Sequence, residues 1–351
     1  MSRVTPRPAT PDPRVWQRHA GYAFLALFFA FADLRLIVIL MPKAFLLSAD
    51  VAEGVVRGVP MWRVYQSRVL GPYLVHALSA FTNDTGVAYA WFALAVLFAT
   101  GFAVLAFADR LRDRTRPPVP SFLLFQLTVI FLLPCLWLYP WDLISLLLFT
   151  VFNYLVLRGA TRAWFVLLYA VAVFNHEIGL LIAGWLALDP LVRFVAARDR
   201  REARGRFEWA QSLTGAGLIV AGLVVIEALR KALLIRETQS PQELPPEVVY
   251  GRSFHFSLPQ NWSTAVSFFT LSVPEGFAFL VPLFLLAVVV LAIRLARSDW
   301  VRFAALSAVL LGMVAAFLCF GLVFETRVLL PLVPFVAMNG WAAFGGRAQS
   351  A

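Results

Sequence analysis

Ten predominantly apolar stretches follow one another along the chain, separated by short polar segments. A helix needs about 20 apolar residues to cross the hydrocarbon layer of a bilayer, and most of these stretches approach that length. We therefore predict an all-α, polytopic bundle of about ten transmembrane helices. The predicted spans are Ala20–Met41, Val87–Ala108, Ser121–Tyr139, Trp141–Leu157, Ala163–Asn175, Glu177–Phe194, Trp209–Lys231, Pro274–Ile293, Phe303–Phe324 and Val328–Phe344.

The polar segments divide the chain into one transmembrane domain, residues 20–346, and two short tails, residues 1–19 and 347–351. Two connections on the predicted outer side are long: residues 42–86 and 232–273. The first contains amphipathic stretches of the kind that lie as helices at a membrane surface. We see no internal repeat of the kind found in many transporters.

Arginine and lysine are distributed unevenly among the connections. With the N-terminus placed in the cytoplasm, 20 of the 30 Lys and Arg residues fall in inner segments. Cytoplasmic loops of membrane proteins carry such an excess. The pattern predicts a multi-pass protein of the plasma (inner) membrane with both termini cytoplasmic. The weakest span, Ala163–Asn175, has 13 residues and could instead join the next span as one long helix, which would reverse the later topology.

Composition supports the membrane class. Hydrophobic residues make up 61% of the chain and charged residues 14%, against about 25% charged in a soluble domain. This balance excludes a soluble enzyme, a disordered chain and a disulfide scaffold. The net charge of +10 comes from short arginine clusters between apolar stretches, so we predict no binding to nucleic acid. Cys135 and Cys319 lie in apolar runs and are interpreted as core residues.

Polar residues that are costly at membrane depth gather in the predicted outer segments, whereas the inner loops are simple arginine-rich connectors. This asymmetry predicts a polar site on the outer face. Simpler interpretations remain open: Asp142 as a helix cap, Glu325 with Arg327 as a headgroup-level ion pair, and His176 with Glu177 as an interfacial pair. The outer residues are Asp50, Glu53, Arg63, Arg68, Asp142, Asn175, His176, Glu177, Glu325 and Arg327.

Motifs for cofactors are absent from the sequence. It contains no HExxH or CxxC metal spacing, no GxGxxG or P-loop, and no GxSxG nucleophile motif. We predict no cofactor and no metal-ligating residues, while a requirement for a divalent metal stays open.

Three segments resemble those of bacterial GT-C-type glycosyltransferases, which are polytopic enzymes that use sugars linked to polyprenyl phosphate. The segment "SADVAEGVVRGVPMWRVYQSRVLGPYLVHALS" resembles their first outer loop, in which an acidic residue is followed by Gly-x-Pro-x-aromatic and R-x-x-x-P. "FNHEIGLLIAGWLAL" resembles their N-x-E-x-G segment, and "FETRVLLPLVPFV" resembles a late E-x-R segment. The chain departs from the family in having a lone Asp50 in place of an acidic pair.

The resemblance implies a sugar transferase at the outer face, with a polyprenyl-phosphate-linked sugar as donor and a glycan, lipid or protein as acceptor. Arg68 and Arg327 would bind the donor phosphate, because the planar guanidinium matches phosphate oxygens. Asp50 would act as the general base, with Glu53 on the same helical face. The cavity would be lined by Arg63, Asp142, Asn175, His176, Glu177 and Glu325.

Two other classes of function remain open from the sequence. One is a transporter or flippase for a lipid-linked or anionic solute. Such proteins usually place their charges near the bilayer midplane, whereas here the charges are at helix ends. The other is a non-catalytic component of an envelope assembly complex, which would tolerate loss of Asp50 and Arg68.

Overall fold

The computed structural model describes residues 13–111, 118–132, 138–199, 207–236 and 326–344, with short pieces at 258–259, 261–263, 289–290, 307, 310–315 and 319. Helices, and no strands, form the regular structure of this part of the chain, so the predicted all-α class is confirmed there. The α-helices are α1 (Pro13–Leu40), α2 (Pro42–Val56), α3 (Leu70–Thr82), α4 (Thr85–Leu111), α5 (Val119–Leu132), α6 (Pro140–Arg158), α7 (Arg162–Ala172), α8 (Leu180–Asp199), α9 (Trp209–Leu233) and α13 (Val333–Phe344); the 3-10 helices are η1 (Arg63–Ser67), η2 (Glu177–Gly179) and η5 (Thr326–Leu332).

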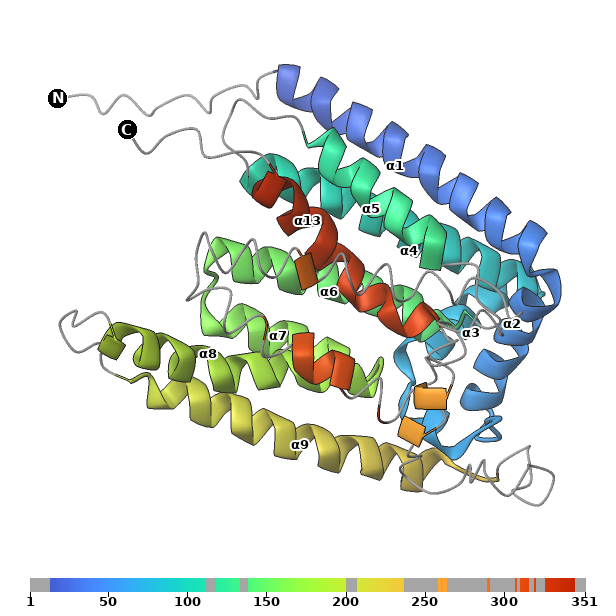
Figure 1. Ribbon diagram of the computed structural model, residues 1–351. Coiled ribbons are helices and arrows are strands. Elements are labelled where there is room, and N and C mark those ends of the chain that lie inside the picture. The colour runs from blue at the N-terminus through green and yellow to red at the C-terminus, as the bar shows by residue number, and fades with distance from the viewer. Residues whose placement is uncertain are drawn as a thin grey trace, which may run out of the picture.

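Helix α6 is the centre of the bundle. It contacts α3, α4, α7, α13 and η5, and Figure 1 shows it between α4 and α7. In its most apolar stretch 83% of the residues are buried, against 17% in α9. Pro140 fits the first turn of α6 because that position needs no backbone N–H donor. Helix α9 instead leaves Leu213, Val220 and Val224 exposed, which is typical of a helix that faces lipid.

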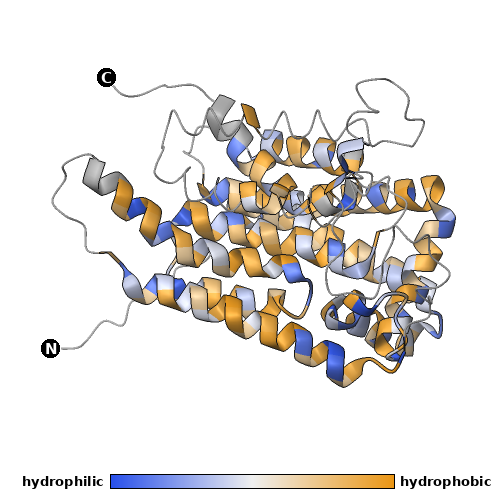
Figure 2. Cartoon of the chain, turned by 60° about the horizontal axis from the view of Figure 1, so that its bottom comes forward, coloured by the Kyte–Doolittle hydropathy of each residue, from blue (hydrophilic) through white to orange (hydrophobic). Residues whose placement is uncertain are grey.

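Among the described residues, five helices are long and apolar enough to cross a membrane, and Figure 2 shows helices dominated by hydrophobic residues. This supports the prediction of a membrane protein with several transmembrane helices. It does not establish the predicted number of ten spans. Three further apolar helices are shorter: Val119–Ile130, Arg162–Ala172 and Leu329–Asn339. The five long segments are Val15–Leu40, Thr85–Leu111, Pro140–Arg158, Glu177–Val195 and Trp209–Leu233.

The structure settles one alternative left open by the sequence. Ala163–Asn175 and the following stretch do not form one long helix, because the chain turns between α7 and η2 at residues 173–176. The 11 residues of α7 rise only about 16 Å, however, about half of the hydrocarbon thickness. The predicted spans Pro274–Ile293 and Phe303–Phe324 lie largely outside the described residues.

The first long connection folds into α2, η1 and α3, so it contains helices as the amphipathic pattern predicted, but residues 57–62 are not helical. A tight contact joins this connection to the end of α9. Gly58 has a φ of +69°, and its carbonyl oxygen accepts hydrogen bonds from the backbone N–H groups of Ile235 (2.7 Å) and Arg236 (3.3 Å). A Cβ at this position would collide with the carbonyl oxygen of Leu233.

We expect Gly58→Ala to lower the free energy of unfolding by about 2 kcal/mol or more, because the left-handed backbone and the collision both oppose a side chain. Thermal unfolding of the detergent-purified protein measures this loss. Gly159→Ala is the matched control, because Gly159 also has a positive φ (+65°) but no atom within 4 Å of a built Cβ. Equal losses for the two variants would show that the contact with α9 adds nothing.

Candidate functional site

Three aromatic rings form the centre of the candidate site. Tyr65 comes from η1, whereas Tyr139 and Trp141 flank the start of α6. Ring centroids are 5.0 Å apart for Tyr65 and Trp141, and 4.6 Å apart for Tyr139 and Trp141. Val51 and Val55 of α2 pack against them, one helical turn apart on the same face. This aromatic cluster fixes the first connection against the central helix.

Two arginines contact the aromatic cluster. The guanidinium carbon of Arg68 lies 5.0 Å from the Tyr65 ring centroid and 5.2 Å from that of Trp141. The guanidinium of Arg327, from η5, lies 4.5 Å from the Tyr139 ring. All three distances allow cation–π attraction. The rings thus hold in one region two arginines that are far apart in the sequence.

Glu177 is the carboxylate that Arg68 contacts. Arg68 Nε donates to Glu177 Oε2 at 3.0 Å, and Arg230 Nη2 from α9 donates to Oε1 at 2.7 Å. The Ser67 hydroxyl also donates to Oε1, at 3.0 Å. We call Ser67, Arg68, Glu177 and Arg230 the Glu177 cluster. It joins η1, η2 and α9, which are widely separated in the sequence.

A second ion pair lies on the Tyr139 side. Arg327 Nη1 donates to Asp142 Oδ2 at 2.9 Å, and each side chain is 5% exposed. The same carboxylate oxygen accepts the backbone N–H of Tyr139 at 3.0 Å, so Asp142 also caps α6. Asp142 therefore takes part in capping α6, but as the third residue of the helix, with Tyr139 at the N-cap position, and this role coexists with the ion pair.

Positive charge exceeds negative charge in the described part of this region. Arg68, Arg230 and Arg327 pair with two carboxylates, Glu177 and Asp142. A third carboxylate, Glu227, lies 3.9 Å from Arg230 but is more exposed and pairs with a fourth arginine, Arg63. Arg230 is 9% exposed at its side chain, and its buried Nε has no hydrogen-bond partner among the described residues. A buried guanidinium is costly unless its charge and its donors are matched. The region is therefore suited to an additional anion.

His176 adds no positive charge to this region. Burial lowers the pKa of His176 from 6.5 to about 3, and the neighbouring Arg68 guanidinium acts in the same direction. Its Nδ1 accepts the backbone N–H of Ile178 at 3.1 Å, which requires that nitrogen to be unprotonated. Nδ1 also lies 3.3 Å from Glu177 Oε2, a close approach of two acceptors in the neutral state.

We expect His176 to make the protein acid-sensitive. Its folded pKa is below its unfolded value, so between about pH 6.5 and pH 3 the unfolded state binds the proton and stability falls as pH falls. The contribution is about 1.4 kcal/mol per pH unit within that window. His176→Asn keeps an acceptor for Ile178 and removes the titration, so its melting temperature should depend less steeply on pH than that of the wild type. Parallel profiles of the two proteins would contradict this role.

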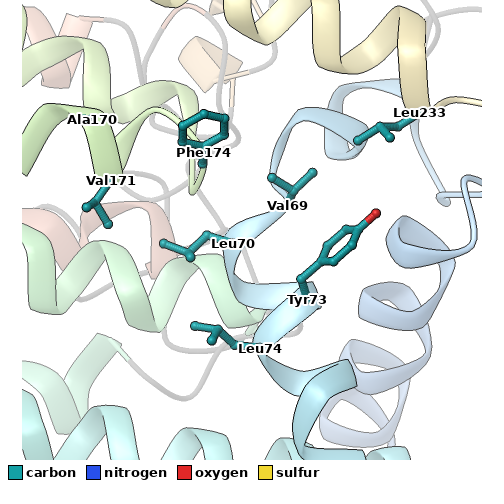
Figure 3. Close-up of a pocket in the computed structure, with 8 residues that line it drawn as sticks. All are labelled: Val69, Leu70, Tyr73, Leu74, Ala170, Val171, Phe174 and Leu233. Carbon is teal, nitrogen blue, oxygen red and sulfur yellow. The ribbon is translucent and has the colours of Figure 1, made fainter.

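An apolar groove of about 470 Å³ opens next to the Glu177 cluster. Figure 3 shows its lining residues, which come from α3, α7, the turn after α7 and the end of α9. Val69 directly follows Arg68, and Leu233 lies one helical turn after Arg230. The walls of the groove are therefore hydrophobic; no arginine lines it, but two of its lining residues adjoin Arg68 and Arg230 along the chain. Its lining residues are Val69, Leu70, Tyr73, Leu74, Ala170, Val171, Phe174 and Leu233.

Of the residues predicted from sequence, four form the two ion pairs around the aromatic cluster: Arg68, Glu177, Asp142 and Arg327. Asn175 joins them through its side-chain N–H₂, which donates to the Trp141 carbonyl at 2.8 Å and to Ser145 Oγ at 3.0 Å.

Two further residues predicted from the sequence do not belong to these ion pairs. Arg63 pairs with Glu227 of α9 at 3.2 Å, and Glu227 also lies 3.9 Å from both Arg230 and Lys231. Glu325 lies outside the described residues.

The structure does not bring Asp50 and Glu53 into the ion-pair region. Asp50 is exposed and projects from α2 on the side opposite to its buried face. Glu53 forms an ion pair with Arg57 and accepts a 3.4 Å hydrogen bond from the Thr85 hydroxyl. Within the described residues Asp50 has no hydrogen bond or ion pair, so its carboxylate is available to bind a ligand. It lies away from the two arginines that contact Glu177.

Arg230 and Glu227 were missed in the sequence, although both contact predicted site residues. Both residues lie near the end of the predicted span Trp209–Lys231, and no role for them was predicted from the sequence. The signal in the sequence is Arg230 itself, a cation that follows 21 predominantly apolar positions and precedes the second long outer connection. Among the described residues no group of three or more His, Cys, Asp or Glu side chains could hold a metal ion.

Comparison with protein-family models, with curated proteins and with solved structures finds no match. The described part of the chain is thus helical, with five helices able to cross a membrane and a cation-rich polar region beside an apolar groove. The resemblance to GT-C-type enzymes stays a prediction.

Proposed function

We propose that the protein is an integral membrane glycosyltransferase that transfers a sugar from a polyprenyl-phosphate donor to a glycan, lipid or protein acceptor on the outer face of the plasma membrane. The observation that carries the proposal is the excess of buried arginine next to the apolar groove. A lipid-linked phosphate has the matching chemistry: an anionic head and a long hydrophobic chain.

The groove fits the lipid chain of the donor. Its walls are hydrophobic side chains, and Phe174 and Leu74 are both partly exposed there. A polyprenyl chain that enters from the bilayer would bury against these walls, which contributes roughly 25 cal/mol for each Å² of apolar surface removed from water. The phosphate would then lie near Arg68 and Arg230, where guanidinium groups donate paired hydrogen bonds to phosphate oxygens.

Transfer requires a bond from the acceptor oxygen to the anomeric carbon of the sugar and cleavage of the bond from that carbon to the phosphate oxygen. The polyprenyl phosphate leaves with the electron pair, and arginine neutralises its charge. A base must take the acceptor proton. Glu177 and Asp142 are engaged by arginine. Asp50 remains the proposed base because its carboxylate has no hydrogen bond or ion pair within the described residues. Since Asp50 lies on the side of α2 away from the arginines, the acceptor would have to present its hydroxyl from that side.

The test is to incubate the purified protein in lipid with a radiolabelled sugar on polyprenyl phosphate and a membrane extract that supplies acceptors. Loss of donor label and its appearance in an acceptor fraction is the expected result. Protein that binds the donor and moves it between leaflets without breaking the sugar–phosphate bond would overturn the proposal in favour of a flippase. Absence of both donor binding and donor consumption would favour a non-catalytic assembly component.

A further inference from the structure

We propose that Glu177 is an internal counter-ion that the phosphate of the lipid ligand displaces from Arg68 and Arg230. The anion site would then be held closed by the protein's own carboxylate when no ligand is bound. This inference rests on the proposed function, since it describes how the same site is controlled. It assigns to Glu177 and Arg230 roles that the resemblance did not suggest.

Glu177 accepts hydrogen bonds from the guanidinium N–H groups that a phosphate would need. Its two oxygens accept from Arg68 Nε (3.0 Å) and from Arg230 Nη2 (2.7 Å), which are charge-assisted hydrogen bonds. Carboxylate and phosphate oxygens bind guanidinium in the same way, so the carboxylate can be replaced by a phosphate at the same nitrogens. The unpartnered Nε of Arg230 offers a further donor that Glu177 leaves unused.

The two ion pairs differ in how easily their carboxylates can leave. The Asp142 side chain is 5% exposed and accepts a backbone N–H as well as Arg327, so moving it would leave several buried groups unsatisfied. The Glu177 side chain is 25% exposed, so its carboxylate can turn toward water, and the phosphate that replaces it would accept the hydrogen bonds that Ser67, Arg68 and Arg230 now donate to Glu177. Glu177 is therefore the carboxylate that can be displaced, and Asp142 is the fixed one.

Charge balance favours displacement. A phosphate diester carries one negative charge, as Glu177 does, and a terminal phosphate carries more. Because the region already contains more buried cations than carboxylates, both Glu177 and a bound phosphate can stay charged in it.

The experiment measures binding of farnesyl monophosphate to the full-length protein in detergent. Glu177→Gln removes the competing charge and keeps the shape of the side chain. We expect the variant to bind farnesyl monophosphate about tenfold more tightly, which corresponds to about 1.4 kcal/mol. Binding of inorganic phosphate should tighten as well, whereas binding of farnesol, which has the chain alone, should not change.

Glu227→Gln is the matched control. It removes the same charge from a carboxylate that lies 3.9 Å from Arg230 but is 38% exposed, and it leaves the Glu177 hydrogen bonds intact. We expect less than a threefold change. Glu177→Asp retains the charge but withdraws the carboxylate by one methylene, so it should bind more tightly than the wild type even where the glutamine variant folds poorly.

Unchanged or weaker binding by folded Glu177→Gln and Glu177→Asp would overturn the inference, as would an equal gain in Glu227→Gln. Wild-type protein that transfers sugar while the Glu177 variants show no gain would refute the counter-ion role alone. A gain in farnesyl monophosphate binding by protein that transfers no sugar would leave the counter-ion role in place and refute the proposed transferase.

Discussion

Replacing Arg68 with alanine should weaken binding of the polyprenyl-phosphate donor by about 100-fold, because a buried partner of a charged ligand typically contributes 2–5 kcal/mol. Arg68→Lys should lose about tenfold, since a point charge replaces a two-pronged donor. Arg230→Ala should resemble Arg68→Ala, because both arginines contact the same carboxylate. Equilibrium binding of the donor to each purified variant measures these losses.

Lys231→Ala is the control for this series. Lys231 neighbours Arg230 on α9 but is 73% exposed, so its removal should change donor binding less than threefold. Equal losses for Lys231→Ala and Arg230→Ala would mean that the overall positive field, and not a defined contact, attracts the donor.

Asp50→Asn should have the opposite profile to the arginine variants. If Asp50 is the general base, turnover should fall about 100-fold while donor binding is nearly unchanged. Normal transfer by folded Asp50→Asn would remove Asp50 from the mechanism.

Much of the helical architecture could be predicted from the apolar runs, because a run that is apolar on all sides specifies a buried or lipid-facing helix. The predicted span Trp209–Lys231 corresponds to α9, Trp209–Leu233, and the predicted span Trp141–Leu157 corresponds to α6. The number of spans does not follow from the apolar runs in the same way, because hydropathy does not say whether a stretch is one helix. Predicted span Ser121–Tyr139 is helical only to Leu132 among its described residues.

The partners within the site could not be predicted, although several of its members could. Charge at outer turns singled out Arg68, Glu177 and Asp142, but the pairs form across 109 and 185 positions in the chain. Such pairing depends on how helices pack, which a local pattern does not specify. Asp50 shows the converse: its sequence position suggested a shared site, but the helical phase of α2 directs it away from the buried face.

The Asp142–Arg327 pair should be the largest electrostatic contribution to folding. Asp142→Asn keeps an acceptor for the Tyr139 N–H but removes the negative charge that faces Arg327. We expect the free energy of unfolding to fall by about 3 kcal/mol, because both side chains are only 5% exposed and Arg327 would lose a buried counter-charge. Chemical or thermal unfolding in detergent measures the loss.

Asp189→Asn is the control, since its partner Arg193 is 60% exposed and can turn to water. We expect this variant to lose less than about 1 kcal/mol. A similar loss in the two variants would show that burial of the Asp142–Arg327 pair does not determine its importance.

The double variant Asp142→Leu with Arg327→Met then separates the structural role of Arg327 from its proposed role in binding phosphate. Replacing both charges with apolar side chains removes the unbalanced charge, so stability should recover to within about 1 kcal/mol of the wild type. If Arg327 binds the donor phosphate, this folded double variant should still bind farnesyl monophosphate at least tenfold more weakly than the wild type. Wild-type affinity in the double variant would mean that Arg327 holds η5 against α6 and that Arg68 and Arg230 alone provide the phosphate site.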